Sequence, residues 1–222
     1  MKSRLSFCCL GLLVAACTTG GPAASPPSPL MSFFVTSVNP GKGADLGGLA
    51  GADQHCQTLA SRVGAGKRTW HAYLSAAAAG HAPAVDARDR IGAGPWYNFN
   101  GELIARNVEE LHSGANHLNK ETALTEMGAV VSGRGDPVNL HDILTGSSPE
   151  GRSVRGDKDI TCGNWTRGSD EGTAIVGHHD RLGPSAEAWA ISWNSSHPSQ
   201  GCSLDALKKT GGGGLLYCFA VD

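Results

Sequence analysis

Four widely spaced cysteines constrain the fold of this chain more than any other feature of its sequence. Of the seven cysteines, three lie within the first 17 residues; of the other four, Cys56 lies in the first third of the chain, whereas Cys162, Cys202 and Cys218 lie in the last third. In an exported chain an even number of cysteines predicts a disulfide framework, and four cysteines allow three pairings. A zinc site made of cysteines is the alternative. We disfavour it because no CxxC-type spacing occurs among the four.

The start of the chain has the pattern of an export signal. Lys2 and Arg4 precede an apolar run over residues 7–16, which is too short to span a bilayer as a mature helix. The run ends in Val14-Ala15-Ala16-Cys17, which resembles the lipobox of bacterial lipoproteins. The resemblance implies a signal peptide of residues 1–16, cleavage before Cys17 and attachment of Cys17 to the membrane through lipid. Because Thr18 follows Cys17, the resemblance suggests that the lipoprotein is exported to the outer membrane. The alternative is an ordinary secretory signal peptide.

Composition divides the rest of the chain into a tether and one domain. Residues 17–30 are rich in proline, glycine and serine, so we expect a flexible tether that buries no core. Residues 31–222 have a length that suits a single domain. Without Lys2 and Arg4 the chain carries 16 basic and 20 acidic side chains. This mildly acidic balance argues against nucleic acid as a partner.

The hydrophobic pattern of residues 31–222 predicts an α+β domain with one main helix and long loops. Apolar residues recur at helical spacing over residues 50–63, with Cys56 on the buried face. Asn100-Gly101 predicts the turn of a hairpin over residues 94–105, and residues 113–158 lack periodicity and are expected to form a long loop. Strands are expected at residues 31–37, 69–75, 160–166, 173–177, 188–193 and 215–221, and short helical segments at 86–91 and 108–112.

The order of the motifs suggests a family. A helix that bears Cys56 is followed by TWHAYLS at residues 69–75, by CGNW at 162–165, by Trp193-Asn194 and by a last strand that reads LYCFA. In this order they resemble the C-type lectin fold, and more narrowly its endostatin-like branch with related bacterial lectin-like lipoproteins. The resemblance covers residues 31–222. It implies a mixed, mostly antiparallel sheet in which the two ends of the domain meet.

The resemblance also implies a nested disulfide pairing, Cys56 with Cys218 and Cys162 with Cys202. In the chain-entropy model the outer loop of about 160 residues contributes about 5 kcal/mol to stability, and the inner loop of about 40 residues contributes about 4 kcal/mol. With 31 glycines and 6% aromatic residues, the chain is expected to have many loops and a modest core. Covalent crosslinks of this kind suit such a domain.

The sequence departs from sugar-binding C-type lectins at their calcium site. That site uses a Glu-Pro-Asn or Gln-Pro-Asp triplet and a later Trp-Asn-Asp, whereas this chain has Trp193-Asn194-Ser195 and neither triplet. Calcium requires six to eight oxygen ligands, several of them carboxylates. We therefore do not expect calcium-dependent sugar binding in the usual mode, although the same face remains a candidate for binding a ligand.

Histidines in the second half of the domain are the candidate site residues. They occur in His141-Asp142, in His178-His179-Asp180 and at His197, and imidazoles with carboxylates suit zinc or another transition metal. Neighbouring histidines on a strand point to opposite faces, so only one of His178 and His179 serves a given site. The alternative is that the imidazoles bond to loop carbonyls. The predicted ligand-binding residues are His141, Asp142, His178, His179, Asp180, Trp193, Asn194 and His197, and the metal candidates are His141, His178, His179, Asp180 and His197.

These observations predict a non-catalytic, membrane-anchored lectin-like lipoprotein of the cell envelope. Its expected partner is a carbohydrate or another surface ligand, and its candidate cofactor is a divalent metal. The chain has no GxSxG or HExxH motif. Two alternatives are kept. A metal-dependent hydrolase would gather the histidines around a metal with an open position for water, and a structural envelope lipoprotein would have no pocket and scattered histidines.

Overall fold

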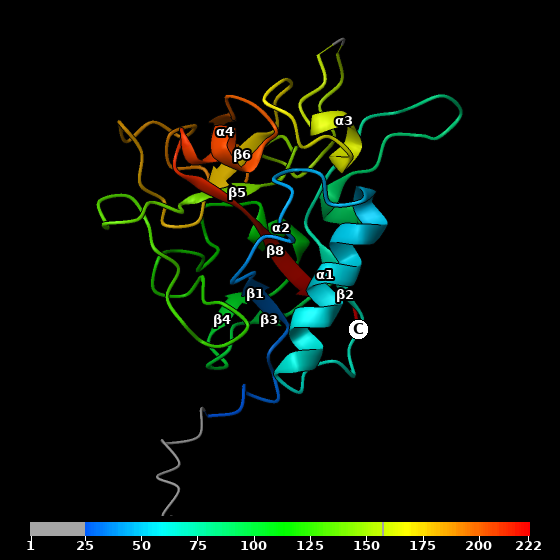
Figure 1. Ribbon diagram of the computed structural model, residues 1–222. Coiled ribbons are helices and arrows are strands. Elements are labelled where there is room, and N and C mark those ends of the chain that lie inside the picture. Colours follow the sequence, from blue (N-terminus) through cyan, green and yellow to red (C-terminus); the bar gives the residue numbers. More distant parts are fainter. Residues whose placement is uncertain (1–24, 157) are drawn as a thin grey trace, which may run out of the picture.

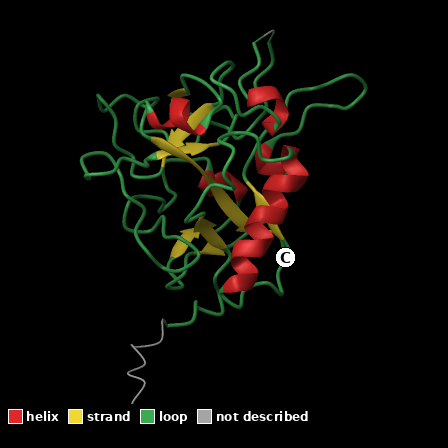
Figure 2. Cartoon of the chain, in the orientation of Figure 1, coloured by secondary structure: helices red, strands yellow, loops and turns green. Residues whose placement is uncertain are grey.

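The structure, a computed structural model, describes residues 25–156 and 158–222. It is an α+β domain with a mostly antiparallel sheet, few helices and long loops (Figures 1 and 2). The predicted signal peptide, Cys17 and the first part of the predicted tether lie outside the described residues. Among the helices of the described part, none is long and apolar enough to cross a membrane.

The last strand, β8 (Gly212–Ala220), organises the main sheet. It pairs antiparallel with β1 (Phe33–Val35) and β2 (Trp70–Ala72) and parallel with β5 (Asp142–Leu144). The sheet continues from β5 into β6 (Ile175–His178) and β7 (His197–Pro198), and both of these pairings are antiparallel. The two ends of the domain therefore meet in one sheet, because Phe34 of β1 lies opposite Cys218 of β8.

Both faces of β8 are buried, and the alternation of its side chains divides the core in two. One half lies under α1 (Gly48–Arg62), whose buried residues include Cys56 and Leu59. Figure 1 shows α1 beside β2, along one side of the sheet. The other half is aromatic and includes Tyr73, Trp96 and Trp193. From β8, the first half receives Leu216, Cys218 and Ala220, and the second half receives Leu215, Tyr217 and Phe219.

A small hairpin with short helical segments covers the aromatic half of the core. It consists of β3 (Trp96–Tyr97) and β4 (Leu103–Ala105), and its turn includes Gly101 at a φ of 82°. The predicted hairpin around Asn100-Gly101 is thus confirmed, and glycine suits the positive φ. The predicted helical segments are also present, as the 3-10 turn η1 (Ala87–Asp89) and the helix α2 (Val108–Leu111).

Two disulfides close the domain, and their pairing is the nested one. Cys56–Cys218 links α1 to β8 across 162 residues of sequence, and Cys162–Cys202 closes an inner loop of 40 residues. All four sulfurs are buried. The outer crosslink therefore fastens the main helix directly to the central strand.

In the second half of the chain the structure departs from the predictions for three segments and contains one helix that was not predicted. Residues 113–158 contain a buried strand, β5, and residues 204–208 form a helix, α4 (Leu204–Lys208). The strand expected at 160–166 is instead the turn α3 (Cys162–Trp165), whose four residues have positive φ. The strand expected at 188–193 is a run of turns. Tertiary contacts explain why neither of these two segments is a strand. The indole of Trp165 donates to the buried carbonyl of Ser75, and the side chain of Trp193 packs in the aromatic core.

Candidate metal centre

The register of three strands brings a carboxylate and two imidazoles to one place in the sheet. Asp142 begins β5 and lies directly opposite His178, the last residue of β6. His197 of β7 lies opposite Val176, two residues before His178 and on the same face. Side chains that are opposite or diagonal across antiparallel strands lie within reach of each other. His141, just before β5, adds a third imidazole next to the first.

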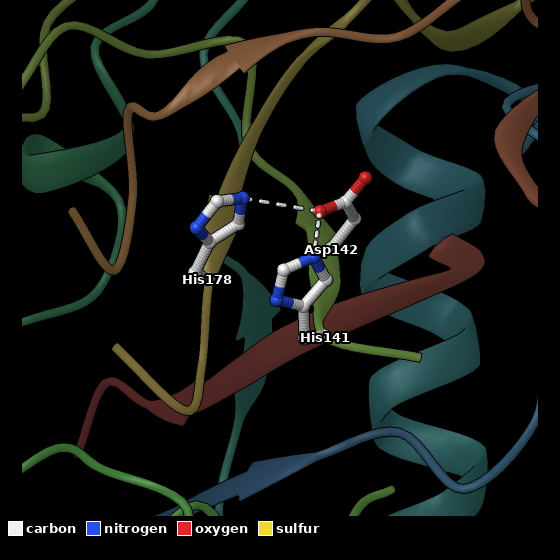
Figure 3. Close-up of side chains that lie close together, drawn as sticks. All are labelled: His141, Asp142 and His178. Carbon is white, nitrogen blue, oxygen red and sulfur yellow. Dashed lines mark ion pairs between the residues drawn. The ribbon is translucent and has the colours of Figure 1, made fainter. Parts of the chain in front are cut away.

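All three imidazoles approach the same carboxylate oxygen. The distances from Asp142 Oδ1 are 3.1 Å to His141 Nε2, 3.3 Å to His178 Nε2 and 3.5 Å to His197 Nε2. The rings of His141 and His178 are stacked, with centroids 4.1 Å apart and planes within 12° of parallel. Figure 3 shows the imidazoles of His141 and His178 converging on Asp142. His141, Asp142 and His178 are almost fully buried, whereas the side chain of His197 is 26% exposed.

The second nitrogen of each imidazole faces an acceptor. His178 Nδ1 donates to the carbonyl of Ala190 at 2.7 Å, and His197 Nδ1 donates to the carbonyl of Pro198 at 3.1 Å. His141 Nδ1 donates to Asp180 Oδ1 at 3.4 Å. Carbonyls and ionised carboxylates only accept, so in each neutral ring Nδ1 carries the hydrogen. The Nε2 lone pairs of the three rings therefore all point into the cluster.

This arrangement is unfavourable while all three imidazoles are neutral, and either a proton on an imidazole or a metal cation between the groups relieves it. Three lone pairs face an oxygen that is itself an acceptor, and within the described residues neither Asp142 oxygen nor His178 Nε2 has a hydrogen-bond partner. An unsatisfied buried polar atom costs about 1–3 kcal/mol, and more when it is charged. One divalent ion would satisfy the ligand atoms of His141, Asp142 and His178 at once, and His197 stands beside them as a fourth candidate ligand. The hydrogen bonds that the imidazoles donate through Nδ1 are those typical of metal sites, in which ligand histidines donate to a carboxylate or a carbonyl.

The spacing of the ligand atoms fits a small tetrahedral ion. With zinc bonds of about 2.0–2.1 Å, the ligand atoms of a tetrahedral site lie about 3.3–3.4 Å apart. The three distances from Asp142 Oδ1 to the imidazole nitrogens, 3.1 to 3.5 Å, bracket this value. The ligand atoms of His141, Asp142 and His178 all lie within 4.8 Å of one another, and His197 approaches the same carboxylate oxygen from β7.

The charge of the cluster is consistent with ligands for a cation. Burial raises the pKa of Asp142, but hydrogen bonds from the imidazoles of His178 and His197, which require a proton on Nε2 in place of a metal ion, outweigh burial and lower that pKa to about 2. The pKa of His197 is raised, chiefly by the carboxylate of Asp142 and against the effect of burial. Asp142 is therefore an ionised carboxylate, and the position between it and His197 favours positive charge.

The other two metal candidates lie outside the cluster. His179 points away from His178, and its Nε2 faces the carbonyl of Ser132 at 3.3 Å. Burial is also the main reason why the pKa of His179 is lowered. Asp180 lies behind His141 and holds its Nδ1 while accepting the backbone N–H of Arg134 at 2.7 Å. Asp180 thus orients a ligand and does not belong to the ligand set itself.

Trp193 and Asn194 lie in the core, away from the imidazoles. The indole of Trp193 is 3% exposed and packs on the rings of Tyr73 and Tyr217. The side-chain amide of Asn194 donates to Tyr73 Oη and to the carbonyls of Ser148 and Pro149. Both side chains are engaged in packing and internal bonds, so the structure gives neither of them a place at the pocket.

A pocket of about 450 Å³ opens over the imidazoles. His141, His178 and His197 form part of its wall, and Asp142 lies beneath them and outside the lining. The remaining lining residues are Arg134, Pro184, Trp189, Pro198, Gln200 and Thr210. The indole of Trp189 is 47% exposed and stands at this pocket.

The sequence prediction missed most of this wall. Gly183-Pro184 upstream of Trp189 is a loop signal that argues against the strand expected there. For Arg134, Gln200 and Thr210 the sequence holds no comparable signal. They reach the pocket only through the packing of loops around the sheet.

The fold and the cluster define an α+β protein with a His₃Asp constellation beneath an open pocket. No model of a known protein family matches the sequence, and no curated protein matches it. The assignment of a function therefore rests on the geometry of this site.

Proposed function

We propose that this protein is a metal-binding module of the cell envelope. His141, His178, His197 and Asp142 would bind zinc or another divalent first-row transition ion. The observation that carries the proposal is the set of three inward-facing Nε2 lone pairs around a buried carboxylate oxygen. Such an ion would provide the positive charge that the cluster needs.

The donor set favours a transition ion over calcium or magnesium. Three imidazole nitrogens and one carboxylate suit zinc, copper or nickel, whereas calcium and magnesium select oxygen ligands. The lining of the pocket contains no carboxylate that could add to Asp142 as an oxygen ligand. This ligand set also differs from the oxygen-rich site of calcium-dependent lectins.

The first prediction concerns zinc binding by the folded domain, residues 25–222. We expect one zinc ion per chain by elemental analysis after equilibration and desalting. We expect His178→Ala and His197→Ala each to lower zinc affinity at least about 100-fold, because loss of a second-shell partner alone costs 10–100-fold. Zinc at 100 times its dissociation constant should stabilise the folded chain by about 2.7 kcal/mol, measured by thermal unfolding with and without EDTA.

A matched control separates this site from adventitious binding to histidine. His81 is exposed in a loop, and His81→Ala should leave zinc affinity unchanged. His197→Ala guards against a folding defect, because the side chain of His197 is partly exposed. Equal zinc binding by wild type, His178→Ala and His197→Ala, or no binding by the wild type, would show that the proposal is wrong.

The expectation of a lectin-like lipoprotein is retained as part of this proposal. We infer that the module is anchored through Cys17 and binds a carbohydrate or another surface ligand without catalysis. The nested disulfides and the pairing of β1 with β8 support a lectin-like arrangement, because the resemblance implies both. Metabolic labelling with a radioactive fatty acid, compared between wild type and Cys17→Ala, tests the anchor.

A metal-dependent hydrolase is the second candidate, because the pocket leaves the imidazoles accessible from one side. A hydrolase also needs a general base near the metal-bound water. The lining contains no carboxylate, and the buried carboxylates of Asp142 and Asp180 serve the imidazoles. The binding function is therefore the better supported one. Hydrolysis of a panel of ester and glycoside substrates by the zinc-loaded chain, abolished by His178→Ala, would favour the enzyme instead.

A further inference from the structure

We propose that the pocket over the imidazoles binds an acidic sugar, a uronic acid, with its carboxylate toward the metal and Arg134 and its ring on Trp189. This inference deepens the proposed function and rests on it, since it requires the ion. Three features of the pocket support this inference. They are the open side of the metal site, the charge of the pocket wall and the exposed indole of Trp189.

The first feature is the side of the cluster that the protein leaves open. The three imidazoles line the pocket, whereas Asp142 lies beneath them and outside the lining. An ion held by all four residues would therefore lie in the floor of the pocket. Zinc with four ligands can accept a fifth, and the open direction leads into the pocket. A ligand atom that enters the pocket can thus reach the ion.

The second feature is the charge of the wall. Arg134 is the only charged side chain in the lining apart from the imidazoles, and the lining contains no Asp or Glu. The backbone N–H of Arg134 donates to Asp180. This hydrogen bond holds the backbone of Arg134 close to His141. A guanidinium near a divalent ion favours an anionic partner, and arginine matches the planar fork of a carboxylate. A neutral sugar would leave this charge without a counterpart.

The third feature is the indole of Trp189. It is the most exposed of the large aromatic side chains in the described residues, and its Nε1 donates to Glu187. That hydrogen bond fixes the orientation of the indole, and the face of the ring stays accessible from the pocket. Exposed aromatic faces bind flat apolar surfaces, and the C–H face of a pyranose is such a surface. A volume of about 450 Å³ lies within the range of small-ligand sites.

These features together select a ligand with two parts, an anionic group and a ring with an apolar face. Acetate has only the first part, and glucose has only the second. Glucuronate and galacturonate have both parts and are small enough for the pocket. These four compounds are therefore the probes that distinguish the proposal from simple anion binding and from simple sugar stacking.

The experiment begins with the folded chain loaded with zinc and, in parallel, with cobalt(II), and metal content is measured first. Calorimetry should show glucuronate or galacturonate binding at least about tenfold more tightly than glucose or acetate, since a charge-assisted bond and a stacked ring each contribute about one factor of ten. The visible bands of the cobalt form should shift with the uronate and stay unchanged with glucose. EDTA should abolish uronate binding.

Two variants test the wall without touching the metal ligands. Trp189→Ala and Arg134→Ala should keep full zinc content and weaken uronate binding roughly tenfold or more. Arg155→Ala is the matched control for charge, because Arg155 is exposed and lies outside the pocket lining; it should bind like the wild type. Uronate binding that survives EDTA, or that both wall variants retain, would overturn the inference, and so would glucose binding as tightly as glucuronate. Full zinc content without uronate binding overturns this inference alone, whereas absence of zinc overturns the metal proposal together with it.

Discussion

At the scale of single residues, burial decides the chemistry of the histidines. Hydrogen bonds at Nδ1 fix the tautomer of the ligand histidines, and the same logic applies to His112, which lies outside the cluster. His112 Nδ1 donates to the carbonyl of Val108 at 2.7 Å, so Nε2 accepts the hydroxyl of Tyr73 at 2.7 Å. Burial lowers the pKa of His112 below 6.5 and raises the pKa of the Tyr73 phenol to well above its ordinary value.

His112 should therefore make the folded chain less stable in mild acid. The unfolded chain takes up a proton near pH 6.5, whereas the folded chain resists it, so the free energy of unfolding falls as pH drops from about 6.5 toward the lowered pKa. We expect His112→Gln to remove this part of the pH dependence. Urea unfolding in EDTA between pH 7.5 and 5.0 should show the wild type losing its advantage over the variant as pH falls. An advantage of constant size over that range would contradict the assignment.

At the scale of elements, the short strands β5, β6 and β7 hold the site in register. Each contributes at most four residues, so the position of Asp142 opposite His178 depends on close packing around β6. Gly177 provides that packing. A Cβ atom at this position would lie 1.9 Å from the carbonyl oxygen of Trp193 and 2.4 Å from the backbone nitrogen of Asn194. The backbone before β7 thus runs against β6 where only glycine fits.

Gly177→Ala should destabilise the domain and disturb the metal site. Forcing one extra carbon into a packed region costs about 1–3 kcal/mol, and the shift would separate β6 from the chain that leads to His197. We expect this loss in urea unfolding of the metal-free chain, together with weaker zinc binding. Gly114→Ala is the matched control, since a Cβ atom there has nothing within 4 Å and should change stability by less than about 0.5 kcal/mol. Equal stability of the two variants would count against this role of Gly177.

At the scale of the whole molecule, the nested disulfides and the position of the site belong together. The first described residues lie at one end of the domain, and β5, β6 and α4 lie at the opposite end (Figure 1). If the chain is anchored through Cys17 as proposed, the pocket lies on the end away from the membrane. The outer disulfide fixes α1 to β8, and the inner one fixes α3 to the loop before α4.

Removing the outer disulfide should cost more stability than removing the inner one. In the chain-entropy model loops of 162 and 40 residues correspond to about 5 and about 4 kcal/mol at 25 °C. We expect the paired substitutions Cys56→Ala/Cys218→Ala and Cys162→Ala/Cys202→Ala to lower the free energy of unfolding in that order. Chemical denaturation of the exported protein measures both. Peptide mapping under non-reducing conditions is the direct check, and a peptide joining Cys56 to Cys162 would contradict the nested pairing.

The sequence by itself determined the features that depend on local spacing and on residue type. The helix around Cys56 follows from its 3.6-residue period, the hairpin follows from Asn100-Gly101, and the use of imidazole and carboxylate groups follows from their presence alone. Only the tertiary structure decided which of these groups meet. The strand that begins at Asp142 has three residues and no alternation to reveal it, and its pairing with β6 and β8 joins distant segments. Long-range register therefore selects His141, Asp142, His178 and His197, turns His179 away and exposes Trp189 in place of Trp193. The local sequence pattern cannot predict which of these residues meet, because their meeting depends on packing between segments that lie far apart in the sequence.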